Sequence, residues 1–412
     1  MGWLPDGLTS KRSKQEVKFL FASNISRAGN RGICYFLAAM CCCLFSQAEA
    51  TEAVCQPVWP AWQSFKAQFI NEGGRVVDNN TTRKQTVSEG QAYALFFALV
   101  ANDQKSFDKI LDWTENNLAD GDLTSHLPAW LWGHKDDGSW GVLDSNSASD
   151  ADLWMVYALG EAGRLWGNRR YVALSSLLAN RIVREETADL PGLGITLLPA
   201  PKGFKTGENA WRLNPSYLPM QIMDWLTNRS SDPVWQKISQ SSFRILLESA
   251  PNGFAPDWTV YESPKGFSVD QHGEGGYNAI RVYLWAGMLA QDAPEHAPLL
   301  AVFTPMIRFV EQHGYPPESV NILTGAANKP GPPGFSAALL PFLQASDDTV
   351  ILHSQLDRLT AHPPHPDAYY DQVLTLFALG WREGYFHFSR DGSLLPNWSE
   401  SCNLAPLKLL PH

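Results

Sequence analysis

The sequence predicts an all-α protein in which six helical hairpins close into a toroid, with one ring of helices inside another. Three observations favour this class. Apolar segments recur about every sixty residues along most of the chain, segments with one polar face lie between them, and strand-like segments are sparse. An open solenoid would share this spacing, but no residue motif repeats between the units, which weakens that alternative.

The segments expected in the inner ring are apolar on nearly every side, as is typical of a helix buried all round. They are Gln91–Ala101, Asp150–Trp166, Pro215–Leu226, Tyr277–Ala290, Gly334–Leu343 and Ala368–Trp381. The segments expected in the outer ring keep a polar face toward water. They are Pro60–Asn71, Asp103–Ala119, Arg169–Glu186, Asp232–Ser249, Glu295–His313 and Ser346–Ala361.

Two short segments, Ile195–Pro199 and Phe386–Ser389, are the only ones that suggest hairpin arms. No linker rich in Pro, Gly or Ser divides residues 51–412, so we expect them to form a single domain. Loops that enter the inner helices of a toroid converge at one end. The functional residues are therefore expected at the N-termini of the inner helices.

The composition narrows the classes of partner. The 412 residues carry a formal net charge of −10, which disfavours nucleic acid and anionic membranes because both attract Lys and Arg. The chain contains 16 Trp. Part of this aromatic content belongs to a core, but indole rings also stack on the flat faces of sugars.

Residues 1–50 are expected to be a secretory signal peptide. Arg27 and Arg31 precede the apolar run Ile33–Phe45, and Ala48-Glu49-Ala50 supplies a small-residue cleavage site. The run is too short to span a bilayer, which needs ~20 residues. A membrane anchor and a buried helix are the alternatives.

Two cysteines, Cys55 and Cys402, remain beyond that segment, one near each end of the expected mature chain. An even pair in an exported protein favours a disulfide between them. Two free thiols, or a lipidated Cys55, are the alternatives.

Two carboxylates are candidates for catalysis. Glu89 follows Ser88, a plausible N-cap of the first inner helix, and Asp150 and Asp152 open the second, where Ser149 and Asp152 resemble a capping box. Asp150 and Asp152 are two residues apart and cannot both face one site. A helix N-terminus lowers the pKa of a carboxyl, so Glu89 needs a neighbour such as Asp150 to serve as an acid. Paired carboxyls of this kind are typical of glycoside hydrolysis.

Other chemistries find little support. The motif G-x-S-x-G of serine hydrolases and the motif H-E-x-x-H of metalloproteases are both absent, and Gly273–Gly276 is not a dinucleotide fingerprint. We expect neither a metal nor a cofactor.

Residues Ala148–Met155, continuing to Ala162 and Trp166, resemble the signature of glycoside hydrolase family 8, with a departure at Val156. Ser88–Gln91, Asn214–Tyr217 and Tyr277–Arg281 resemble further motifs of that family in the same order, and the likeness covers residues 55–402. It implies a six-hairpin α-toroid that hydrolyses β-1,4-glucan with inversion, with catalytic carboxyls ~6.5–9.5 Å apart. It further implies a monomeric periplasmic endoglucanase of bacterial cellulose synthesis, with contact to the synthase or export complex as an additional expectation.

The resemblance also implies roles for individual residues. Glu89 matches the general acid and Asp150 its carboxylate partner. The expected substrate-binding residues are Asp152, Tyr217, Asn278, Arg281, Tyr369 or its neighbour Tyr370, and Trp130 and Trp132, for which core packing is an equal alternative.

One departure concerns the catalytic base. Many family members have Asp where this chain has Asn278, and an amide cannot accept the proton of the attacking water. Glu274 is our first substitute, since its glycine-rich loop can swing it into the cleft, and Asp270 and Asp150 are the others. The alternative is a weakly active or purely glucan-binding protein.

Overall fold

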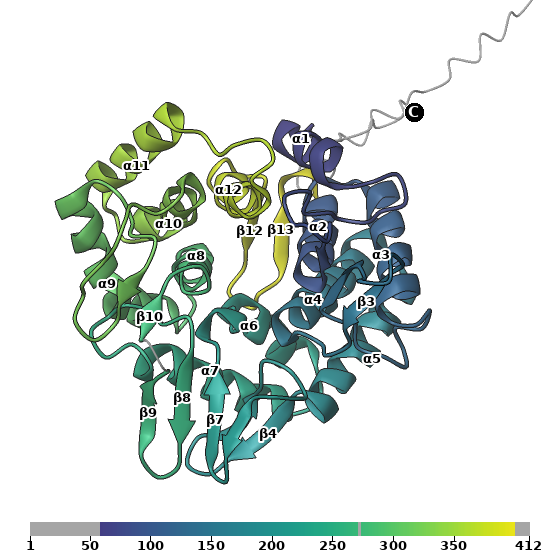
Figure 1. Ribbon diagram of the computed structural model, residues 1–412, viewed down its shortest axis with the longest axis horizontal. Helices are drawn as coiled ribbons and strands as arrows, with labels where there is room; N and C mark the ends of the chain where they lie inside the picture. The colour runs from purple at the N-terminus through teal and green to yellow at the C-terminus, as the bar shows by residue number, and fades with distance from the viewer. Residues whose placement is uncertain (1–57, 271–272, 400–412) are drawn as a thin grey trace, which may run out of the picture. The chain divides into compact units, whose positions relative to one another are not determined.

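The computed structural model describes residues 58–270 and 273–399, which belong to one compact unit. The predicted signal peptide and the predicted Cys55–Cys402 disulfide lie outside the described residues. Twelve α-helices in the described part alternate along the chain between an outer and an inner ring (Figure 1). This confirms the predicted all-α toroid of six hairpins.

The outer helices are amphipathic, and their buried residues lie on one face. They are α1 (Pro60–Phe69), α3 (Gln104–Leu118), α5 (Arg169–Glu185), α7 (Val234–Glu248), α9 (His296–His313) and α11 (Thr349–Ala361). Side chains cap three of them: Asp103 accepts a hydrogen bond from the N–H of Ser106, and Asn168 and Asp348 cap α5 and α11 in the same way.

The inner helices are buried almost all round. They are α2 (Ser88–Val100), α4 (Ser149–Trp166), α6 (Met220–Arg229), α8 (Ile280–Met288), α10 (Pro333–Ala345) and α12 (Tyr369–Arg382). Each of the first five packs against the outer helix that follows it, and α1 packs against α12 to join the two ends of the chain. In none of these six helices does the side chain of the N-cap residue itself accept a hydrogen bond from the first turn. Backbone carbonyls of other segments accept some of the first N–H groups instead, as Trp130 does for Ser88 and Pro199 for Ser149.

Three local predictions were wrong at the starts of inner helices. Ser88 and Ser149 are the first residues of their helices rather than N-caps, and neither hydroxyl has a hydrogen-bond partner in the structure. The third inner helix begins at Met220, not Pro215. Residues Pro215–Tyr217 form a separate 3-10 turn, and Pro219, which lacks an N–H donor, marks the start of α6.

Aromatic rings fill the centre of the barrel. Trp154 of α4 lies 5.1 Å from Trp285 of α8 and 5.1 Å from Phe377 of α12, and Phe377 stacks on Phe96 of α2 at 5.4 Å, all measured between ring centroids. These rings are buried. Much of the tryptophan of this chain therefore serves the core, and the aromatic centre gives the cleft above it a rigid floor.

A hairpin closes the other end of the inner ring. Its strands are β12 (Phe386–Phe388) and β13 (Leu394–Pro396), and Phe386 packs edge-on against Phe96 at 5.0 Å. Tyr157 of α4 donates a hydrogen bond of 2.8 Å to the carbonyl of Gly392 in the hairpin turn. The predicted arm at 386–389 is confirmed, and it leaves only the N-terminal end of the inner helices open.

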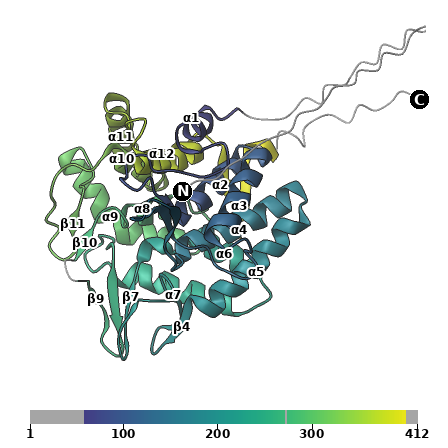
Figure 2. The ribbon, with the colours of Figure 1, turned by 45° about the vertical axis from the view of Figure 1, so that its right-hand side comes forward.

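The loops hold more strands than the sequence predicted. Antiparallel sheets are formed by β1 (Thr86–Val87), β2 (Leu131–His134) and β3 (Trp140–Asp144); by β4 (Thr187–Leu190) and β5 (Gly194–Leu197); by β6 (Lys205–Gly207), β7 (Ala210–Leu213), β8 (Thr259–Glu262) and β9 (Gly266–Val269); and by β10 (Glu274–Gly275) and β11 (Val320–Asn321). The strands β7 to β9 project from the rim (Figures 1 and 2). All the strands of these sheets have two to five residues, which is too short to show a periodicity in the sequence. No helix in the described part is both long and apolar enough to cross a membrane.

Candidate active site

Three inner helices bring one charged side chain each to the open end of the barrel. Glu89 is the second residue of α2, Asp150 the second of α4, and Arg281 the second of α8. The backbone of Trp130 joins the first two helix entries: its carbonyl accepts a hydrogen bond of 3.0 Å from Ser88, and its N–H donates to Asn146 at 2.7 Å. The positive ends of the helix dipoles meet here and favour carboxylates.

Arg281 is the centre of the hydrogen-bond network. Its Nη1 donates to a carboxylate oxygen of Glu89, to Asp150 Oδ2 at 2.9 Å and to the Tyr93 hydroxyl at 3.0 Å. Its Nη2 donates to Asn278 Oδ1 at 2.9 Å. The guanidinium is almost fully buried, so only these partners compensate for its lost hydration.

Glu89 and Asp150 both bind Arg281 and interact directly, and each alters the pKa of the other. Burial raises the pKa of Asp150 well above its ordinary value, and the negative charge of Glu89 adds to that rise. Burial also acts to raise the pKa of Glu89, but Arg281 and the hydrogen bond from Asp150 outweigh it and lower that pKa. These opposite directions favour Asp150 over Glu89 as the member that holds a proton.

This contact contradicts the expected separation of the two carboxyls. An acid and a base that act across a water molecule stand ~6.5–9.5 Å apart, and an acid and a nucleophile ~5–5.5 Å. Carboxyls in direct hydrogen-bond contact satisfy neither arrangement. The pair is suited to storing and passing a proton, and a base for water has to come from elsewhere.

Only one member of the pair is accessible. The side chain of Glu89 is 26% exposed, whereas that of Asp150 is 1% exposed. Asp150 Oδ1 also accepts a hydrogen bond from the N–H of Ala151 at 2.8 Å. A sugar in the cleft can therefore touch Glu89 but not Asp150, which argues against Asp150 as the base.

The other two candidate bases lie in different surroundings. Asp270 accepts two hydrogen bonds from Arg212, at 3.1 and 2.8 Å, and is thus committed to an ion pair. Glu274 lies on β10, opposite Asn321, with an exposed side chain. Within 58–270 and 273–399, the Glu274 carboxylate has no ion pair or hydrogen bond. The structure does not bring it into contact with Glu89 or Arg281.

Asn278 is held by Arg281 and by two residues to which the sequence assigned no role, Asn214 and Asp257. Its Oδ1 accepts from Arg281 and from Asn214 Nδ2, the latter at 3.2 Å. Asp257 Oδ1 accepts the N–H groups of Gly276, Asn278 and Ala279 at 2.9, 2.8 and 2.7 Å. Asp257 thus caps the turn before α8 from a distant loop, and no local sequence signal marks this contact.

The predicted tyrosines surround the pair. The Arg281 guanidinium carbon lies 5.6 Å from the centroid of the Tyr217 ring. Tyr370 donates a hydrogen bond of 2.5 Å to the carbonyl of Tyr277. The Tyr369 hydroxyl lies close to Gly90, and a Cβ at position 90 would be 2.5 Å from that oxygen. This close approach explains the glycine after Glu89. Tyr93, one turn after Glu89, is a further site residue that the spacing alone did not identify.

Asp152 does not reach the cleft, which contradicts its predicted contact with substrate. It faces the other side of α4, is fully buried, and forms a carboxyl–carboxyl hydrogen bond with Glu186. Ser147 Oγ donates to Glu186 Oε1 at 2.5 Å. The capping box predicted for Asp152 is also wrong, because Ser149 Oγ makes no hydrogen bond.

The two predicted stacking residues have different surroundings. Trp130 is half-buried, hydrogen-bonds to the Asp144 carboxylate and packs against the core. Trp132 is covered by Trp140, whose ring lies 5.4 Å away at 18°, and by Arg75 at 4.2 Å. An extended face of Trp132 is therefore not open to a sugar.

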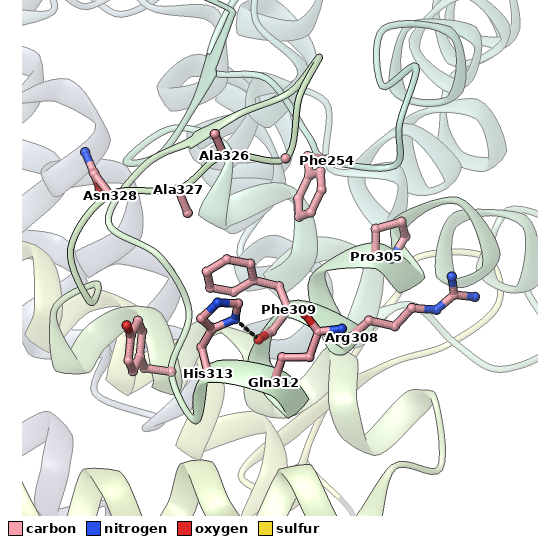
Figure 3. Close-up of a pocket in the computed structure, with 11 residues that line it drawn as sticks. Phe254, Pro305, Arg308, Phe309, Gln312, His313, Ala326, Ala327 and Asn328 are labelled. Carbon is pink, nitrogen blue, oxygen red and sulfur yellow. Dashed lines mark hydrogen bonds between the residues drawn. The ribbon is translucent and has the colours of Figure 1, made fainter.

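A separate cavity of about 490 Å³ lies between α9 and residues 325–328 (Figure 3). Phe254, Pro305 and Phe309 supply apolar walls, and His313 stacks on Phe309 at 4.0 Å and hydrogen-bonds to its carbonyl oxygen. No carboxylate lines this cavity, so it lacks the paired carboxyls found at Glu89 and Asp150. Across the described residues, no group of three or more His, Cys, Asp or Glu is arranged to hold a metal ion.

Comparison with known proteins agrees with this chemistry. The model for Glycosyl hydrolases family 8 matches residues 31–384. The endoglucanase of Escherichia coli O157:H7 is 50% identical over 361 residues, covering 87% of this chain and 96% of that protein. The crystal structure of an endo-1,4-D-glucanase from Vibrio fischeri ES114 has a TM-score of 0.77 at 47% identity, covering 83% of this chain and 99% of that one.

A more distant solved structure, the endo-β-1,4-glucanase CMCax from Acetobacter xylinum, has a TM-score of 0.64 at 27% identity and covers 78% of this chain and 97% of that one. The family match extends over most of the chain and includes both helix starts that carry the paired carboxyls. This chain belongs to glycosyl hydrolase family 8 and is a glycoside hydrolase.

Proposed function

We propose that this protein is an endoglucanase that hydrolyses internal β-1,4 bonds of glucan with inversion, and that Glu89 is its general acid. The observation that carries the proposal is the carboxyl pair beside Arg281, of which only Glu89 is open to the cleft. The relatives named endoglucanase support the substrate class.

In this mechanism, Asp150 supplies the proton that Glu89 donates as the general acid. When a glucan chain covers Glu89, it removes water from the exposed oxygen, and desolvation favours the neutral form of that carboxyl. The proton then passes from Asp150 to Glu89 along their hydrogen bond. Glu89 donates it to the glycosidic oxygen as the C1–O bond breaks, and Arg281 stabilises the charge left on the pair.

Water attacks the anomeric carbon from the opposite face and must lose a proton there. Asn278 cannot take it. We assign this step to Glu274, supported by an exposed carboxylate that forms no ion pair with any described residue and lies four residues before Asn278. Reaching the cleft requires a movement of the short β10 segment, which pairs with two residues of β11 and whose Glu274 carbonyl accepts a hydrogen bond of 2.8 Å from the N–H of Asp257.

We further propose that the protein is a monomer exported to the periplasm and acts there on glucan during bacterial cellulose synthesis, in contact with the synthase or export complex. The support for export is the signal-like segment before residue 51 and the cysteine pair. Cell fractionation tests the location: the protein is expected with periplasmic markers, and recovery of the full-length chain in the cytosol would contradict it.

The activity is tested with purified protein and carboxymethylcellulose. An endo-acting enzyme lowers the viscosity before much reducing sugar appears, because one internal cut halves a chain but creates only one new end. Early release of disaccharide without loss of viscosity would contradict the endo mode. Retention of cello-oligosaccharide without any hydrolysis would identify a binding protein instead.

A further inference from the structure

A second aromatic cluster lies on the three-stranded sheet beside the active site. Trp132 on β2 and Trp140 on β3 stack at 5.4 Å, and Trp113 of α3 meets Trp132 edge-on at 5.3 Å. The Arg75 guanidinium lies 4.2 Å from the centroid of Trp132 and 4.9 Å from that of Trp140. We call these four residues the tryptophan platform.

Arg75 holds the platform in one arrangement. Its Nε donates to Thr86 Oγ1 at 2.8 Å, and Thr86 Oγ1 donates to the carbonyl of Val76 at 2.6 Å. Burial lowers the pKa of Arg75 to about 10, so the guanidinium remains charged at neutral pH. Within the part of the chain that the structure describes, Arg75 forms no ion pair with a carboxylate, and the faces of the indoles are its main electrostatic partners.

Only one ring of the platform is open to solvent. Trp140 is 49% exposed, and it is the single tryptophan among the exposed large hydrophobic residues of the described ranges. An exposed indole costs hydration free energy, and this one is packed against Trp132 and Arg75 while about half of its surface stays accessible.

The platform is continuous with the active site through the sheet. Thr86 of β1 pairs with Trp132, and Glu89 follows the end of β1 by two residues. Trp140 pairs with His134, two positions farther along β2 than Trp132. At ~3.3 Å per residue, these steps place Trp140 several sugar units from Glu89 rather than beside it.

We propose that Trp140 is a distal stacking site for a ring of the same glucan chain whose bond is cleaved at Glu89. The inference rests on the proposed function and adds a subsite to it. Trp132 supports Trp140 from behind instead of contacting sugar itself. The occupant is a neutral sugar ring, because Trp140 offers a flat face and its charged neighbour Arg75 is buried beneath.

The test compares substrates of different length. Trp140→Ala is expected to lower kcat/KM on cellohexaose roughly 2- to 10-fold, the range of a single ring-stacking contact, while leaving kcat/KM on cellotriose unchanged. Trp140→Phe keeps an aromatic face and should restore most of the loss. Tyr315→Ala, in the remote cavity of Figure 3, is the matched control and should affect neither substrate.

Binding is measured separately in a Glu89→Gln background. In this background, cellohexaose but not cellotriose is expected to change the tryptophan fluorescence. Adding Trp140→Phe should remove that change. Equal losses on both substrates, or no loss on either with a retained fold by circular dichroism, would overturn the proposal. An inactive wild-type protein would contradict the proposed function, yet the fluorescence arm would still decide whether Trp140 binds glucan. Capture of another protein at Trp140 without any glucan effect would also overturn it.

Discussion

Two carboxyl pairs each take one member from the first turn of α4, Asp150 in the first pair and Asp152 in the second. The two pairs differ in almost every respect that matters for catalysis. Asp150 pairs with Glu89 at the mouth of the cleft, with a buried Arg281 bonded to both. Asp152 pairs with Glu186 on the opposite side of the helix, where the hydroxyl of Ser147 donates a hydrogen bond to Glu186. Both pairs are desolvated, but only the first has a cation and an opening.

The difference shows what makes a carboxyl pair reactive. Burial raises the pKa of both members of the second pair, so that pair is stabilised in its protonated form. In the first pair, Arg281 opposes burial on Glu89 and leaves the proton on Asp150. A proton that has two unequal positions, one of them next to the substrate, is available for transfer. Variants that change one group of these pairs at a time test whether the cation and the opening make the first pair reactive.

The largest effect is expected for Glu89→Gln. The amide keeps the shape and the hydrogen bond to Arg281 but cannot donate a proton, so kcat should fall by at least the ~10²–10⁴ that a general acid contributes. Oligosaccharide binding should survive, as measured by calorimetry. Asp152→Asn, in the second pair, is the control and should retain most activity. Hydrolysis at the wild-type rate by Glu89→Gln would contradict the assignment of the acid.

The next effect separates Glu274 from the other candidate bases. If Glu274 activates water, Glu274→Gln lowers kcat by ~10²–10⁴ and Asn278→Asp restores part of it in the double variant. Glu318→Gln, on a neighbouring loop and hydrogen-bonded to the Tyr277 hydroxyl, controls for a lost surface charge. Unchanged kcat in Glu274→Gln, together with a rise in Asn278→Asp alone, would mean that the wild-type protein works without an efficient base.

A smaller effect is expected for Asp150→Asn, and its signature is a pH shift. The variant has no titrating proton at position 150, so the alkaline limb follows the lowered pKa of Glu89 beside Arg281 instead of the raised pKa of Asp150. The general acid must be protonated, so the alkaline limb of kcat/KM should move to lower pH. Activity lost equally at every pH, with no movement of that limb, would instead indicate that Asp150 takes part directly.

The sequence predicted the features that depend on local pattern. The twelve helices follow from apolar periodicity, and Glu89, Asp150 and Arg281 each occupy the second position of an inner helix, where a motif can mark them. Contacts between segments that are distant in the sequence could not be predicted. Asp257 caps α8 from a loop some twenty residues earlier, and no pattern around it differs from that of a surface turn.

The pairing of Asp152 was missed for the same reason. Its partner Glu186 is the C-cap of α5, and only the packing of α4 against α5 brings the two carboxyls together. The stack of Trp140 on Trp132 likewise depends on the register of the β2–β3 hairpin, in which His134 faces Trp140. Short strands leave that register unspecified in the sequence.

The smallest effect concerns stability and tests the second pair. Burial raises the pKa of Glu186 from its ordinary 4.5 to about 8. Between these values the unfolded chain is ionised while the folded protein keeps the proton, so unfolding releases a proton and stability falls as the pH rises through this window, by at most ~1.4 kcal/mol per pH unit. Glu186→Gln cannot ionise in either state and should show a flatter Tm from pH 5 to 8, with its advantage over wild type greatest at pH 8. Glu248→Gln, which removes the carboxylate of an ion pair with Arg244 on α7, should keep the wild-type slope. Parallel Tm curves for wild type and Glu186→Gln would show that the second pair carries no proton, and the contrast between the two pairs would then rest on Arg281 alone.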